Sequence, residues 1–270
     1  MEPTKKISTM KVRERGMKKL LGKIKNIICR YSILLTIVRG IQRIYYHFLV
    51  AIGIPIKEKY ELSFWQNQKK KERNLENSHY KYFYMKHFNL DESFYKNKRI
   101  LDIGCGPRGS LEWADMALER VGLDPLVESY RGLGINNHKM SYVCARAENI
   151  PFEDGYFDIV TSFNSLDHVD NLDQAINEIV RVLTPSGTFL LLTEVNHRPT
   201  PCEPIEFSYD IEKKFIQKDM KLIEANHYEK FKEGIYANIR ANIPYDHHNK
   251  TKRCGFLSAI FIKCVKEKKG

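Results

Sequence analysis

The chain has 270 residues, which allows one large domain with an appended segment or two modest domains. Its 43% apolar residues, 15 Gly and 10 Pro exclude a disordered, collagenous or low-complexity protein. Residues 1–60 contain 14 Lys and Arg against 3 Asp and Glu, whereas residues 61–270 contain 30 of each class. The formal charge of +11 therefore lies in the first 60 residues, which excludes a uniformly basic globule and indicates a basic arm joined to a charge-balanced domain.

The first predicted element is a long basic amphipathic helix in the arm formed by residues 1–60. Its apolar positions recur every three or four residues, as on one helical face. They are Leu20, Ile24, Ile27, Ile28, Tyr31, Leu34, Leu35, Val38, Ile41, Tyr45, Phe48 and Ile52. Most of the lysines and arginines between residues 18 and 43 fall outside this stripe.

This helix is predicted to lie on an anionic membrane surface through residues 18–56. In residues 31–55, two arginines each add roughly +2.5 to +3.5 kcal/mol to the free energy of insertion into a bilayer. A dozen Leu, Ile, Val and Phe residues, at about −0.3 to −0.6 kcal/mol each, only offset this cost. The longest uncharged run, Ile44 to Ile56, has 13 residues, which is too short to span a bilayer. An apolar stripe with a polybasic flank favours the headgroup region. Packing of the same stripe on the main domain or on a second subunit is the alternative.

Residues 61–270 are predicted to form an α/β domain that opens with an aromatic-rich segment at 61–98, interpreted as a lid. Predicted strands cover residues 99–103, 120–123, 141–144, 157–163, 187–193, 220–227 and 256–264. Predicted helices cover residues 109–117, 126–132, 172–183 and 210–218. This alternation predicts a doubly wound, Rossmann-like, mostly parallel seven-stranded sheet. Because a long loop without a clear helix joins the last two strands, we expect an antiparallel edge strand.

The chemistry begins where the first predicted strand runs into a glycine-rich turn, RILDIGCGPRGS, at residues 99–110. Gly104, Gly106 and Gly109 satisfy G-x-G-x-x-G, which alone is a weak signal. Asp102 stands two residues before the first glycine, where a carboxylate repels a pyrophosphate and attracts a cationic ligand. Asp124 ends the second predicted strand, a position that suits a grip on a ribose diol.

Five segments in this order and spacing resemble the class I S-adenosylmethionine-dependent methyltransferases, of the small methyltransferase-domain type. The resemblance runs from about Arg99 to Glu194. Besides the glycine loop and Asp124, it includes ARAENIPFEDGYFDIV at 145–160, NSLDHV at 164–169 and the helix EIVRVLTPSG.

The resemblance implies S-adenosyl-L-methionine as cofactor. It places Asp102 at the cofactor's ammonium, Gly104 and Gly106 along its methionine part, and Asp124 at the ribose hydroxyls. Arg146 stands where the family usually has an acidic or polar residue that meets the adenine amino group. Ala147 and Glu148 are therefore assigned to that contact. Cys105 and Asn164 complete the predicted cofactor-binding set, and Cys105 is interpreted as a small filler without thiol chemistry.

Methyl transfer from a sulfonium depends chiefly on positioning and on exclusion of water, so a base is optional. For a hydroxyl acceptor, the predicted catalytic residues are His168, after the fourth strand, and His197, beyond the fifth. A neutral imidazole could accept the hydroxyl proton. The alternative for His168 is a structural hydrogen bond, and the alternative for His197 is a surface histidine without a partner.

The predicted reaction is O-methylation of a glycan, lipid-linked or small-molecule acceptor. Nucleic acid is a disfavoured partner, because residues 163–166 lack the Asn-Pro-Pro-aromatic arrangement associated with methylation of base amines. Three alternatives stay open: a soluble small-molecule methyltransferase, an NAD-type oxidoreductase, and a catalytically silent membrane-associated adaptor that retains the fold.

The six cysteines show no C-x-x-C spacing and no neighbouring histidines of the metal-site type. No metal site and no disulfide framework are predicted from them. We therefore expect a reducing, cytoplasmic setting, with peripheral attachment to the inner face of a membrane.

Overall fold

A computed structural model describes residues 56–200, 202–232 and 234–265. The predicted amphipathic helix, which begins at residue 18 and ends near residue 56, lies almost wholly outside these residues. The compact unit to which the described residues belong begins at Lys57. Among the residues that the structure describes, no helix has the length and apolar character needed to cross a bilayer.

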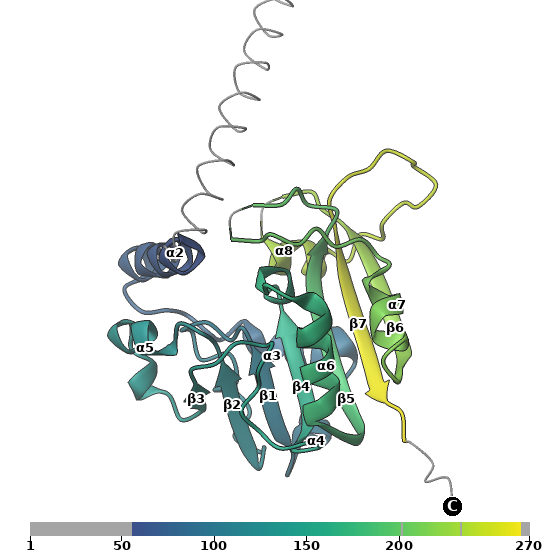
Figure 1. Cartoon of the computed structure of the whole chain (residues 1–270). Coiled ribbons are helices and arrows are strands. Elements are labelled where there is room, and N and C mark those ends of the chain that lie inside the picture. Colours follow the sequence, from purple (N-terminus) through teal and green to yellow (C-terminus); the bar gives the residue numbers. More distant parts are fainter. Residues whose placement is uncertain (1–55, 201, 233, 266–270) are drawn as a thin grey trace, which may run out of the picture. The chain divides into compact units, whose positions relative to one another are not determined.

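Seven strands form one sheet in the order β3-β2-β1-β4-β5-β7-β6 (Figure 1). Their bounds are β1 Arg99–Ile103, β2 Glu119–Leu123, β3 Ser141–Val143, β4 Phe157–Phe163, β5 Leu183–Val195, β6 Met220–Glu229 and β7 Gly255–Lys263. Each predicted strand is confirmed, and the doubly wound α/β fold is confirmed with them. The strand order reverses between β1 and β4, and ligands of such sheets bind at the carboxyl ends of the strands at this point.

Antiparallel pairing occurs only at the β6 end of the sheet. β1 to β5 pair in parallel with their neighbours, whereas β7 runs antiparallel to both β5 and β6. The expected antiparallel edge is therefore present as the β6–β7 hairpin. Its connection contains α8 (Ile235–Ala241), where no helix was predicted.

Three of the four predicted helices are present. They are α5 (Val127–Tyr130) with the short 3-10 turn that follows it, α6 (Leu172–Val182) and α7 (Ile211–Ile216). The predicted helix at residues 109–117 is wrong, because this segment forms a series of turns. Gly109 has a φ of +76°, and the Arg120 guanidinium donates to the carbonyls of Leu111 and Glu112, which a helix would have used internally.

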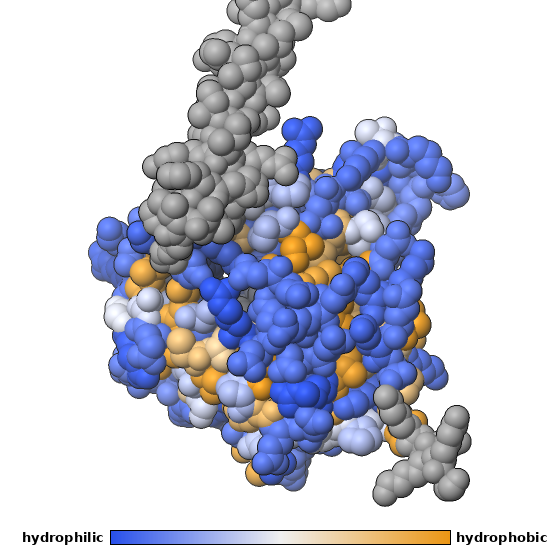
Figure 2. Space-filling model, in the orientation of Figure 1, coloured by the Kyte–Doolittle hydropathy of each residue, from blue (hydrophilic) through white to orange (hydrophobic). Residues whose placement is uncertain are grey.

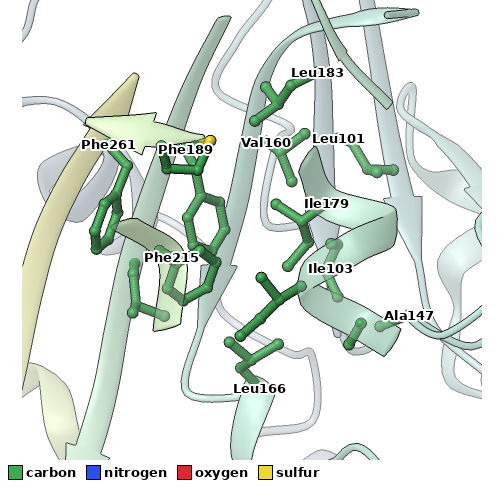
Figure 3. Close-up of a cluster of buried hydrophobic side chains, with 14 of the residues drawn as sticks. Leu101, Ile103, Ala147, Val160, Leu166, Ile179, Leu183, Phe189, Phe215 and Phe261 are labelled. Atoms are coloured by element: carbon green, nitrogen blue, oxygen red, sulfur yellow. The ribbon is translucent and has the colours of Figure 1, made fainter. Parts of the chain in front are cut away.

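Side chains that alternate along the strands build a separate core on each face of the sheet. On one face, Leu101, Ile103 and Val160 belong to one buried cluster with Ile179 of α6, and Phe215 of α7 packs there against Phe189 and Phe261 (Figure 3). The face of the described residues shown in Figure 2 is mainly hydrophilic, with apolar patches between polar residues.

The opposite face carries most of the aromatic segment at residues 61–98. Phe83 and Tyr84 of α3 (Tyr80–Tyr84), Phe88, and Tyr95 of α4 (Glu92–Tyr95) are buried there with Ile100. This part of the segment belongs to the core, not to a lid. The earlier part forms α2 (Ile56–Glu72), which Figure 1 shows at the same end of the sheet as α8.

Candidate active site

A cavity of about 840 Å³ opens at the carboxyl ends of β1, β2 and β4. This volume is at the upper end of the range for small-molecule sites. Seven of the predicted cofactor residues line it, together with His168: Gly104, Cys105, Gly106, Asp124, Ala147, Glu148 and Asn164. Asp102 and His197 do not line it.

The glycine loop depends on glycine because other parts of the chain pack directly against it. Gly104 and Gly106 have φ of +68° and +58°, in the left-handed region that L side chains rarely adopt. A Cβ on Gly104 would lie 2.2 Å from Cβ of Ser165, and a Cβ on Gly106 would lie 3.0 Å from the Trp65 ring. The loop backbone therefore lies bare along the cavity wall.

Asp124 is a buried carboxylate on this wall. Its Oδ2 accepts from the Gly106 backbone N–H at 3.2 Å, and its Oδ1 accepts from the Leu126 N–H at 2.9 Å. Burial raises the pKa of Asp124 to about 6, although both backbone hydrogen bonds act in the opposite direction. The carboxylate is thus fixed in place with lone pairs still free for a ligand's hydroxyl groups.

Asp102 lies beneath the loop, with 2% of its surface exposed. It accepts hydrogen bonds from the hydroxyls of Ser110 and Thr161, the latter at 2.6 Å, and burial raises its pKa to about 6. This carboxylate braces the loop against β4 and is not among the residues that line the cavity, so its expected contact with the ammonium stays a prediction.

The predicted adenine contacts have additional structural roles. Ala147 is buried on the cavity wall. Glu148 also lines the cavity, but its Oε1 accepts from the backbone N–H groups of Asp170 and Asn171, at 2.6 and 3.0 Å. Arg146 is turned to ion pairs with Glu58 of α2 and with Asp170, both at 2.6 Å.

Two further predicted residues shape the floor of the site. Asn164 has a φ of +56°, and its backbone N–H donates to the Leu192 carbonyl at 2.7 Å, which fixes the turn after β4. Cys105 is buried, and desolvation raises the pKa of its thiol well above the ordinary value. It fits the predicted role of an inert filler.

α2 forms a wall of the cavity that the sequence analysis did not identify. It contributes Lys57, Glu58, Tyr60, Glu61, Phe64, Trp65 and Glu72 to the lining. The helix lacks a clear apolar stripe, so periodicity gave no sign of it. The available signal was charge: its acids at Glu58 and Glu72 stand opposite Arg146 and Arg108, which each follow a predicted strand.

The other end of the cavity carries a polar cluster around His168. Its Nδ1 lies 3.9 Å from Glu61 of α2, and its Nε2 lies 3.9 Å from both Asp167 and Glu203. His197 lies behind this wall, with Nε2 3.5 Å from Asp167. Of these five residues, only the two histidines were predicted to be functional.

The pKa values of this cluster are displaced by burial. Desolvation lowers the pKa of His168, so its imidazole is neutral near pH 7. Desolvation, with the nearby charge of Glu203, raises the pKa of Asp167 well above the ordinary value. Burial also raises the pKa of Glu61 to about 7, against a hydrogen bond from the Trp65 ring N–H at 2.7 Å. Such displaced groups in one cavity are typical of functional sites.

A family model described as "Methyltransferase domain" matches residues 101–191, which run from β1 into β5 and include the glycine loop and Asp124. The match covers about a third of the chain, and this segment is similar to methyltransferase domains.

Three curated methyltransferases are similar to this chain over part of its length. A sterol 4-C-methyltransferase of Caenorhabditis elegans is 35% identical over 36% of this chain and 31% of its own. The chloroplastic tocopherol O-methyltransferase of Arabidopsis thaliana is 34% identical over 38% of this chain and 32% of its own length. The ubiquinone/menaquinone biosynthesis C-methyltransferase of Vibrio parahaemolyticus is 31% identical over 54% of this chain and 60% of its own length. The chain thus spans about a third of the length of the first two relatives.

S-adenosylmethionine fits this cavity on structural grounds. Gly104 and Gly106 line the cavity as backbone without side chains, and their close packing against Ser165 and Trp65 leaves no space for a Cβ, while Asp124 presents a fixed acceptor suited to a ribose diol. The lysine and arginines among the described lining residues are all engaged by carboxylates: Arg108 and Arg146 by Glu72 and Glu58 of α2, and Lys57 by Asp170. The residues present therefore suit a cationic nucleoside better than a pyrophosphate.

Proposed function

We propose that this chain is an S-adenosylmethionine-dependent methyltransferase that methylates a hydroxyl oxygen of a lipid-like acceptor. One observation carries the proposal: a single cavity connects the glycine loop and Asp124 at one end with His168 at the other. A methyl donor held at the first end and an acceptor at the second can meet in line without leaving the protein.

The donor is held by groups of this chain with separate tasks. Asp124 accepts from the ribose hydroxyls, the backbone of residues 104–106 lies along the methionine part, and Leu126 and Ala147 offer an apolar slot for the base. The bound sulfonium supplies an electrophilic methyl group. In the transfer an O–CH₃ bond would form as the S–CH₃ bond breaks, S-adenosylhomocysteine would leave with the sulfur electron pair, and the hydroxyl proton would pass to water.

The proposed apolar character of the acceptor rests on α2. Tyr60 and Phe64 line the cavity, yet 61% and 51% of their surfaces are exposed. Large exposed aromatic side chains at a cavity mouth favour an apolar partner over a sugar. Three of the relatives, which are methyltransferases of a sterol, of tocopherol and of ubiquinone and menaquinone biosynthesis, support the same class.

Attachment to an anionic membrane through residues 18–56 stays a prediction. It is compatible with an acceptor drawn from a lipid phase, because a basic amphipathic segment would hold the enzyme at the surface where such a molecule resides.

The test is transfer of a labelled methyl group from S-adenosylmethionine by the full chain to three acceptor sets: phenolic or sterol-like lipids in vesicles, soluble phenols, and lipid-linked glycans. We expect label in an ether on the first set. Transfer to soluble phenols alone would contradict the lipid-like acceptor and favour a soluble small-molecule acceptor. Transfer to carbon or nitrogen would contradict the oxygen assignment.

Binding separates the remaining alternatives. Calorimetric titration is expected to give heat with S-adenosylmethionine and none with NAD, and Asp124→Asn is expected to abolish most of the signal. Tight binding of NAD would contradict the proposal. Cofactor binding with no methyl released to any set would favour a silent adaptor.

A further inference from the structure

Three metal-ligating side chains converge on the acceptor wall of the cavity. Asp167 and His168 lie in the turn after β4, and Glu203 comes from the loop after β5. One ligand atom from each lies within 4.8 Å of those of the other two. Within the described ranges, these are the only three His, Cys, Asp or Glu residues that meet in this way.

Buried polar atoms without partners face the centre of this group. The side chain of Asp167 is 1% exposed, and its Oδ1 has no hydrogen-bond partner. Nε2 of His168, 3.9 Å from that oxygen, also lacks one. Leaving a buried carboxylate oxygen unpaired costs free energy, so such atoms point to a missing partner. With a second carboxylate at Glu203 on the far side, a cation is the partner that satisfies all three residues.

We propose that Asp167, His168 and Glu203 bind one divalent metal ion. The 3.9 Å spacings exceed the separation of about 3.4 Å that tetrahedral ligands at about 2.1 Å would have. The separation between Asp167 and Glu203 is at most 4.8 Å, so shifts of roughly 0.5 to 1.5 Å by the partly exposed His168 and Glu203 would bring the three ligand atoms to this spacing. A donor set of one imidazole and two carboxylates suits Mn²⁺, Co²⁺ or Zn²⁺ better than the all-oxygen preference of Ca²⁺.

The surrounding side chains match the outer shell of a metal site. His197 faces the other oxygen of Asp167 with Nε2 at 3.5 Å, and its side chain is 9% exposed. Glu61 lies 3.9 Å from Nδ1 of His168, the ring nitrogen that would not bind the metal when Nε2 is the ligand. In metal sites, a residue that contacts a ligand in this way, as His197 contacts Asp167 and Glu61 contacts His168, orients the ligand and tunes its basicity. His197, predicted as catalytic, becomes a positioning residue.

The open side of the ion would face the cavity. His168 and Glu203 line the cavity, whereas Asp167 lies behind them. Three protein ligands leave a coordination position for a further oxygen, as in catalytic metal sites. On the basis of the proposed function, the acceptor hydroxyl occupies this position and loses its proton to water more readily there. His168 then acts as a ligand and not as the free base predicted from sequence.

Metal binding is tested directly with the tag-free full chain, stripped with a chelator and titrated with Mn²⁺ under electron paramagnetic resonance. We expect one Mn²⁺ per chain. His168→Gln and Glu203→Gln are expected to weaken binding about 100-fold or more, and His197→Gln about 10- to 100-fold. Glu206→Gln is the matched control. Glu206 lies three residues after Glu203 and pairs with Lys252, so this variant removes the same negative charge from outside the proposed ligand set.

Folding of each variant is checked by circular dichroism, and His168 and Glu203 are only partly buried, so their variants should fold. Folded wild-type protein that binds no Mn²⁺, Co²⁺ or Zn²⁺ would overturn the site. Undiminished binding in both ligand variants would overturn it too, because the ion would then lie elsewhere.

The catalytic part has its own readout. Chelation is expected to lower methyl transfer at least tenfold without changing cofactor affinity, and Mn²⁺ should restore the rate. Unchanged transfer after chelation would overturn the acceptor-binding role and leave the metal site standing. A confirmed metal site with no methyl transfer to any acceptor would contradict the proposed function alone.

Discussion

Arg108 of the glycine loop and Glu72 at the end of α2 form a bidentate ion pair, with both N–O distances at 2.7 Å. Arg108 also donates to the Glu76 carbonyl at 2.8 Å and lies over the Trp65 ring. The loop that approaches the cofactor is therefore tied directly to the helix that walls the cavity. At the opposite end of α2, Arg146 and Glu58 make a second tie, at 2.6 Å.

Arg108→Ala is expected to weaken S-adenosylmethionine binding about tenfold. Hydrogen bonds between charged groups contribute about 1.5–3 kcal/mol each when partly buried, and their loss frees one end of α2. Titration calorimetry measures the affinity, and hydrogen exchange over residues 56–72 measures the loosening. Arg131→Ala, which breaks an exposed pair with Glu128, is the control. Equal exchange of α2 in both variants would show that the tie does not hold the helix.

Gly104→Ala is expected to lower the free energy of unfolding by about 2 kcal/mol or more. The added Cβ would clash with Ser165 and would hold alanine at a φ of +68°. In a chain of this size the melting temperature should fall by roughly 4–8 °C. Gly132→Ala is the control, because nothing lies within 4 Å of its Cβ. A variant as stable as the control would refute the close packing of the loop.

Cofactor affinity is expected to fall about tenfold between pH 7 and pH 5. Burial raises the pKa of free Asp124 to about 6, and the ionised form is the better acceptor for ribose hydroxyls. Binding thus favours the deprotonated carboxylate, so affinity is full above this pKa and is lost as the pH falls through it. Titrations at several pH values check this. Asp124→Asn should bind weakly with a flatter profile, and a steep profile in that variant would assign the titration to another group.

Tyr60→Ser with Phe64→Ser is expected to raise KM for a lipid-like acceptor about tenfold or more, because two large apolar contacts are lost. Cofactor affinity should stay within about twofold. Ile216→Ser removes a comparably exposed apolar side chain from α7 and serves as the control. An unchanged acceptor KM would place the acceptor elsewhere in the cavity, whereas a matching loss of cofactor affinity would indicate general damage to α2.

Local signals in the sequence were sufficient for the sheet and for much of the cofactor wall. β1 and β4 have the predicted bounds, because short apolar runs between turn residues admit few other structures. Asp124 and Gly104 were found because their roles depend on adjacent residues of one strand-to-loop connection. The predicted helix at 109–117 failed because Arg120, on the next strand, takes the carbonyls that the helix needed.

The sequence by itself determined the doubly wound sheet, the glycine loop and the position of Asp124 directly after β2, since each is encoded within a few consecutive residues. Only the tertiary structure decided that Asp102 braces the loop from below, that α2 closes the cavity, and that Glu203 joins Asp167 and His168. These relationships join residues up to about a hundred positions apart. Their geometry depends on how loops and helices pack over the sheet, which spacing along the chain does not specify.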